Sequence, residues 1–153
     1  MSTTLKKTAT LDYNTWSSNT QSNRNFVLYG TAMTATAATF SGTIKITDSA
    51  SSPNTVASWS LDSTTGTTST LLGHVDANPS SYTYPLNISA NMTVSGSKLD
   101  ALSDSSRQIG TKLESGNDVP ISFETVIFFN DQGSDNDYND CVLNFVLFNQ
   151  SSD

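Results

Sequence analysis

Short stretches of the chain alternate between apolar and polar residues with a period of two. In the segment 121–129, the positions 121, 123, 127 and 129 are apolar, whereas Ser122 and Glu124 are polar. In the segment 141–148 both faces are apolar, because Val142, Val146 and Phe148 alternate with a second apolar set. This is the period of a β-strand, whose successive side chains point to opposite faces. We therefore predict a strand in each segment, the second buried on both faces.

Weaker alternation marks further candidate strands at 8–11, 25–29, 36–40, 43–47, 56–61, 70–75, 82–88 and 92–94. Clusters of small polar residues, Gly and Pro separate them and predict turns at 48–54, 62–68, 76–81 and 115–118. The 3.6-residue period of a helix is absent, and a single helical turn is expected at 99–107. Short strands at this spacing predict an all-β sandwich or barrel.

Composition supports an all-β fold and excludes several functions. The chain has 25 Ser and 22 Thr among 153 residues, a length that fits one domain over residues 1–153. Seven Lys and Arg against 14 Asp and Glu leave a net charge of −7, so we expect neither nucleic-acid binding nor binding to anionic membranes. The single cysteine, Cys141, excludes an intrachain disulfide and a cysteine zinc cluster.

Targeting signals are also absent from the sequence. It contains no apolar run of about 18 residues, so we expect no membrane insertion. Lys6 and Lys7 are not followed by the apolar segment of a cleavable signal peptide. We expect the protein to be made in the cytoplasm, and any secretion or surface association to use another route.

Negative charge is concentrated in the segment 131–140, Asp-Gln-Gly-Ser-Asp-Asn-Asp-Tyr-Asn-Asp, which we call the acidic loop. Its four carboxylates repel one another unless a counter-charge is present. Calcium takes about six to eight oxygen ligands, and Asp, Asn and backbone carbonyl groups are its usual donors. The spacing is not that of an EF-hand, because Asp140 and Val146 occupy the positions of the required Gly and Glu. Two calcium ions would neutralise the four carboxylates.

Three interpretations of the acidic loop are open on these grounds. It is a solvated turn, a loop stiffened by one structural calcium ion, or a calcium site that also contacts a ligand. We favour the third, because calcium with open coordination positions can bind adjacent sugar hydroxyl groups while carboxylates accept their protons in hydrogen bonds.

The acidic loop resembles the calcium loop of the two-calcium bacterial lectins that bind fucose and mannose, a family best known from Pseudomonas and related soil bacteria. The match consists of Asp131, Gly133 and the run 135–140, followed by an apolar terminal strand. Two weaker similarities are the segment 36–42 and the segment 17–21, the latter near the family's sugar-specificity loop.

The resemblance implies an antiparallel β-sandwich of about nine strands, with two calcium ions per subunit bound directly to sugar hydroxyl groups. By position, the ligands of the first ion would be Asp131, Asp135, Asp137 and Asp140, and those of the second Asp137, Asn139 and Asp140. The implied sugar-binding residues are Ser17, Ser18, Asn19, Gln132, Asp135, Asp137, Asn139 and Asp140. Ser17 and Ser18 would tune selectivity. The resemblance also implies a homodimer or a higher homo-oligomer.

The sequence departs from the family pattern in several places. Asp131 replaces a Glu, Gln132 replaces a sugar-contacting Asp, and Trp16 stands where the family has a calcium-binding Asn. Asn14 or Asn19 is the candidate replacement for that Asn. The family's terminal carboxylate enters the partner's site, a role that would fall to the longer tail 150–153.

Other reactive residues do not point to catalysis. Ser residues are abundant, but no Gly-x-Ser-x-Gly motif accompanies the single His74. Cys141 is expected to be buried, and Trp59 to pack in the core. We therefore expect a calcium-dependent lectin that binds a monosaccharide or glycan and is not an enzyme. The alternative is a structural or adhesion module that calcium stiffens and that binds no sugar.

Overall fold

The computed structural model describes residues 1–13, 25–114, 117–131 and 138–150, with the backbone alone described between 105 and 120. These described residues form seven strands: β1 (Thr3–Leu11), β2 (Phe26–Thr47), β3 (Thr55–Asp76), β4 (Leu86–Val94), β5 (Asp100–Glu114), β6 (Asn117–Asn130) and β7 (Cys141–Asn149). Every pairing between them is antiparallel, so the predicted all-β class is confirmed. In the same ranges, no helix has the length and apolar character needed to cross a membrane.

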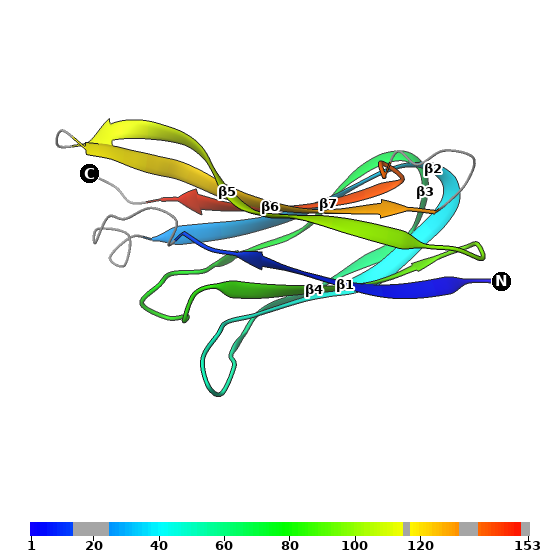
Figure 1. Ribbon diagram of the computed structural model, residues 1–153, viewed down its shortest axis with the longest axis horizontal. Helices are drawn as coiled ribbons and strands as arrows, with labels where there is room; N and C mark the ends of the chain where they lie inside the picture. The colour runs from blue at the N-terminus through cyan, green and yellow to red at the C-terminus, as the bar shows by residue number, and fades with distance from the viewer. Residues whose placement is uncertain (14–24, 115–116, 132–137, 151–153) are drawn as a thin grey trace.

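All seven strands belong to one sheet that folds over itself into two layers (Figure 1). In the first layer β1 pairs with β4, and β4 pairs with Phe40–Thr47 of β2. In the second layer β5, β6 and β7 follow one another, and β7 pairs with Phe26–Thr34 of β2. β2 and its partner β3 therefore run through both layers. The described chain therefore forms seven strands and not the about nine that the resemblance implies, because β2 and β3 each continue from one layer into the other.

β2 and β3 bend where their pairing is irregular. The register shifts on either side of Phe40, between Thr36 and Phe40 and again between Phe40 and Gly42. Such bulges bend a strand and increase its twist. Gly42 permits the close approach of β4, because a Cβ atom there would lie 2.5 Å from the backbone oxygen of Asn91. Figure 1 shows β2 and β3 curving together at one end of the molecule.

Several predicted boundaries were wrong for this reason. The candidate strands 25–29, 36–40 and 43–47 form one continuous strand, β2. The predicted turn 62–68 continues β3, although Gly66 within it has the left-handed φ of 82° typical of turns. The predicted helical turn 99–107 is part of β5, whose backbone pairs with β6. Hydrogen bonds to a distant strand outweighed the local turn preference in each case.

The core lies between the two layers. Its largest fully buried side chains include Phe26, Phe40, Phe123, Phe129 and Phe145. Trp59 packs against this core, as predicted, and lies over a pair of glycines that face each other across β2 and β3. Added Cβ atoms at Gly30 and Gly73 would lie 2.4 and 2.3 Å from atoms of the Trp59 indole ring.

β7 is buried on one face only, which corrects the prediction for its second face. Its inward side chains, Cys141, Leu143, Phe145 and Leu147, are all 0% exposed. On the outward face Val142 and Val146 are partly buried and Phe148 is 39% exposed. No strand of the described chain covers this apolar face.

Candidate calcium-binding loop

The acidic loop connects the end of β6 to the start of β7. Figure 1 shows these strand ends at the end of the molecule where β2 and β3 curve from one layer to the other. Asp131 follows β6 directly, and Asp140 directly precedes β7. Because β6 and β7 pair from Phe129 and Cys141 onward, the sheet brings the two ends of the loop together.

Hydrogen bonds join these two ends to each other and to β2. The backbone N–H of Asp131 donates to Oδ2 of Asp140 at 2.8 Å, and the hydroxyl of Thr36 donates to Oδ2 of Asp131 at 2.8 Å. The backbone N–H of Ala35 donates to the backbone oxygen of Asp140 at 3.0 Å. The Asp140 carboxylate therefore holds the backbone of Asp131, and the two ends of the acidic loop meet at the bend of β2.

Tyr138 fastens the loop to a third strand. Its hydroxyl donates to Oδ2 of Asp100 at the start of β5, and its backbone has a φ of 53°. This hydrogen bond lowers the pKa of Asp100 and raises the pKa of Tyr138. A tyrosine with positive φ is uncommon and needs surrounding contacts to hold it. This contact anchors the acidic loop to the start of β5.

The structure describes three of the predicted calcium ligands. Asp140 is buried, Asp131 is partly buried and Asn139 is exposed. The other predicted site residues, Gln132, Asp135, Asp137, Ser17, Ser18 and Asn19, lie outside the described residues. Among the residues that are described, no group of three or more His, Cys, Asp or Glu could hold a metal ion. The donor set fits calcium, because the acidic loop offers only oxygen ligands and two of its aspartates are already adjacent.

The residues that flank Ser17, Ser18 and Asn19 lie at the far end of the sheet from Asp140. Phe26 pairs with Asn149, the last residue of β7, and the ring of Tyr13 lies 5.4 Å from that of Phe26. Eight residue steps along β7 separate this end from the acidic loop, a distance of about 26 Å. The sugar-binding role of Ser17, Ser18 and Asn19 stays a prediction.

Sequence reasoning missed the role of Thr36 as a neighbour of the loop. Thr36 is 95 residues away from Asp131 in the chain, so no local pattern connects them. The segment 36–42 was noted for its resemblance to an early family strand, but its contact with the acidic loop depends on the bend of β2. Cys141, next to the loop, is buried as predicted, and burial raises the pKa of its thiol to about 12.

Comparison with known proteins gives weak likenesses. No protein-family model and no curated protein matches the chain. Among solved structures, it is similar to the C-terminal domain of the BC2L-C lectin from Burkholderia cenocepacia, with 18% identity, a TM-score of 0.45, and coverage of 97% of this chain and 100% of that chain. It is also similar to the Chromobacterium violaceum lectin CV2L in complex with alpha-methyl-fucoside, with 20% identity, a TM-score of 0.38, and coverage of 80% and 87%.

A third likeness, to a structure of infectious bursal disease virus Gx strain, has 12% identity and a TM-score of 0.32, and covers 99% of this chain and 32% of that chain. Two of these three neighbours are described as lectins. With TM-scores below 0.5, the likenesses carry no argument about the ligand. The functional interpretation rests on the loop itself.

Proposed function

We propose that this protein is a calcium-dependent carbohydrate-binding protein without catalytic activity. The observation that carries the proposal is the closure of the acidic loop, in which Asp131 and Asp140 meet beside Thr36. Asp135 and Asp137 lie on the same ten-residue loop, so four carboxylates belong to one short segment whose ends coincide. Their mutual repulsion favours uptake of a hard divalent cation.

In the proposed site, Asp131, Asp135, Asp137 and Asp140 hold one calcium ion, and Asp137, Asn139 and Asp140 hold a second. Calcium supplies open coordination positions for two neighbouring sugar hydroxyl groups. The chain's own contribution is to place the carboxylates: β6 and β7 position the two ends, and the hydrogen bonds from Thr36 and Tyr138 tie the loop to β2 and β5. Ligands of fucose or mannose type fit the resemblance.

Titration of the folded protein with calcium, and then with methyl fucoside and methyl mannoside, tests the proposal. We expect sugar binding that requires calcium and disappears with a chelator. Asp137→Ala should abolish sugar binding and most calcium stabilisation, because Asp137 would bridge both ions. At about 100 times its dissociation constant, calcium should stabilise the wild type by about 2.7 kcal/mol for each ion bound.

Asp62→Ala is the matched control, because Asp62 is an exposed carboxylate on β3 outside the acidic loop. This variant should bind calcium and sugar as the wild type does. Full sugar binding by Asp137→Ala would disprove the bridging role, and the absence of calcium uptake by the wild type would disprove the site.

The second candidate is a structural or adhesion module in which calcium only stiffens the loop. This candidate is favoured by the hydrogen bonds of Asp131, Asp140 and Tyr138. These bonds restrain both ends of the acidic loop, as a loop with a structural role requires. It predicts a melting temperature that rises with calcium and does not respond to any glycan on an array.

We also propose that a second copy of the chain covers the outer face of β6, β7, β2 and β3. Outward residues in register across this face include an apolar row formed by Phe128, Val142 and Met33. The face is four strands wide and about seven residues long, which corresponds to an area of about 450 Å² at the usual strand spacing and rise per residue. Two such faces together reach about 900 Å², which is below the about 1,200 Å² of standard specific interfaces and therefore suits a weak or transient dimer.

A further inference from the structure

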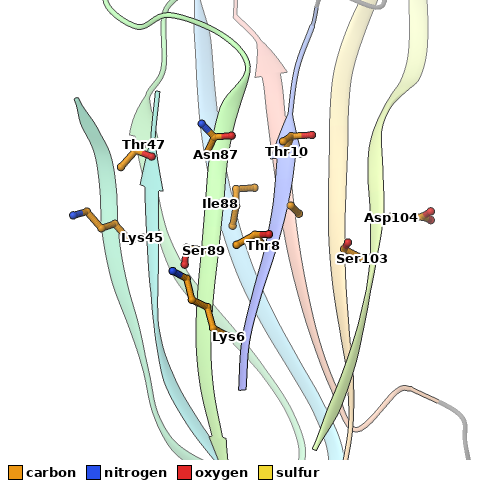
Figure 2. A pocket seen from close by; sticks show the side chains of 11 residues that line it. Lys6, Thr8, Thr10, Lys45, Thr47, Asn87, Ile88, Ser89, Ser103 and Asp104 are labelled. Atoms are coloured by element: carbon orange, nitrogen blue, oxygen red, sulfur yellow. The ribbon is translucent and has the colours of Figure 1, made fainter. Parts of the chain in front are cut away.

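A hollow of about 770 Å³ lies on the outer face of the first layer, away from the acidic loop (Figure 2). It is lined by side chains of β1, β4 and β2, most of them outward, and by Ser103 and Asp104 of β5. We call it the lysine groove, after Lys6 and Lys45. None of its lining residues belongs to the acidic loop, so binding there would not need calcium. The volume is in the range of about 300–1,000 Å³ that ligand sites usually have.

Strand register arranges the polar side chains of the lysine groove in rows. Lys45, Ser89 and Thr8 lie side by side on β2, β4 and β1. The next row along the strands consists of Thr47, Asn87 and Thr10. These hydroxyl and carboxamide groups can both donate and accept hydrogen bonds, as sugar hydroxyl groups require.

The two lysines make this face locally positive on a molecule whose net charge is −7. Both are exposed, and Figure 2 shows their ammonium groups at separate positions along the groove. Their Cα atoms are two strands and two residues apart, which corresponds to about 12 Å. The acidic residue among the described residues that line the groove is Asp104, on the β5 side. Two separated cations favour an extended ligand with several anionic groups over a single small anion.

We propose that the lysine groove binds an anionic oligosaccharide, with its sulfate or carboxylate groups on Lys6 and Lys45 and its hydroxyl groups on the polar rows between them. The site adds to the proposed calcium site, and the two can be tested separately. Since the lysines are exposed, the affinity should fall steeply as salt is added.

Isothermal titration of the full chain with a sulfated tetrasaccharide tests the proposal. The buffer contains a chelator, and circular dichroism verifies that the strand content is retained. We expect binding in the wild type and a loss of roughly tenfold or more in affinity for Lys6→Gln and for Lys45→Gln, since each removes a charge-assisted hydrogen bond. Lys98→Gln is the matched control, because Lys98 is exposed and lies outside the groove.

The unsulfated tetrasaccharide and inorganic sulfate form separate arms of the experiment. The proposal is overturned if the sulfated sugar does not bind, if both groove variants bind it as the wild type does, or if inorganic sulfate binds as tightly. Loss of affinity in Lys98→Gln equal to that in the groove variants would also overturn it. Methyl fucoside binding in calcium buffer reports on the acidic loop alone, so failure at one site is distinguishable from failure at the other.

Discussion

At the scale of single residues, Asp48 shows how one carboxylate joins two turns. It is 1% exposed and accepts backbone hydrogen bonds from Thr83 at 2.9 Å and from Asn54 at 2.7 Å. The side-chain amide of Asn54 donates a further bond at 3.0 Å. These hydrogen bonds lower the pKa of Asp48 to about 2, and the bond from the backbone of Thr83 has the largest effect. The turn after β2 is thereby tied to the segment that leads into β4.

We predict that Asp48 makes stability depend on pH in the acid range. A carboxylate whose pKa is lower in the folded than in the unfolded state stabilises the fold above its unfolded pKa. Its contribution is lost as the pH falls from about 4 towards the folded value of about 2. Denaturant titrations between these pH values should show a fall in unfolding free energy for the wild type and a weaker fall for Asp48→Asn. Equal pH dependence in the two proteins would contradict this role.

At the scale of elements, the bent pair of β2 and β3 determines how the two layers meet. Trp59 lies in the first half of β3, and its indole ring packs against Gly30 and Gly73. These two glycines pair with each other, Gly30 in the first half of β2 and Gly73 in the second half of β3. A small residue is needed at Gly30 and Gly73 because the indole ring occupies the space of a side chain. The sequence showed these glycines, but only the fold showed what they accommodate.

Gly30→Ala should destabilise the protein by about 1–3 kcal/mol, the usual cost of overpacking. Gly66→Ala is the comparison, because no atom lies within 4 Å of the added Cβ atom. Any loss of stability in that variant comes only from the strain of placing an alanine at a φ of 82°. Thermal and denaturant unfolding measure both. Trp59→Leu in the Gly30→Ala background should recover part of the loss, and the absence of recovery would show that the clash is not with the indole.

Two segments outside the acidic loop also give predictions at this scale. The resemblance predicts that Ser17→Ala or Ser18→Ala changes selectivity among sugars and leaves calcium affinity intact. The contact of Thr36 with Asp131 predicts that Thr36→Val weakens calcium binding, because one support of that carboxylate is lost. Titration of each variant with calcium, methyl fucoside and methyl mannoside checks both expectations. Unchanged selectivity in the serine variants would contradict the role that the resemblance gives to Ser17 and Ser18.

At the scale of the whole molecule, the two outer faces differ in character. The face of β1, β4 and β2 carries hydroxyl groups and lysines, whereas the face of β6, β7 and β2 carries an apolar row of Phe128, Val142 and Met33. Phe148 and Met33 on the second face are 39% and 41% exposed. A large apolar patch on a folded protein commonly marks an interface. The polar face is therefore the one available to a soluble ligand, and the apolar face is the one suited to a second copy.

We predict that Phe148→Glu converts the proposed dimer to a monomer, because it places a charge on the apolar face of each copy. Light scattering coupled to gel filtration measures the mass, expected to change from twice 16.4 kDa to 16.4 kDa. Thr43→Glu, on the exposed polar face, is the control and should stay dimeric. A monomeric wild type would contradict the proposed interface.

The sequence alone determined the all-β class, the inward face of β7 and the acidic loop, because these depend on local alternation and on adjacent charges. The small polar residues of the segment 62–68 predicted a turn, but the segment continues β3. Its pairing with β2 outweighs the preference of these residues for a turn. Tertiary structure decided which distant residues meet: Thr36 with Asp131, Tyr138 with Asp100, and Lys45 in one row with Thr8. The physical reason is that such contacts depend on strand order and register, which arise from the packing of the whole sheet.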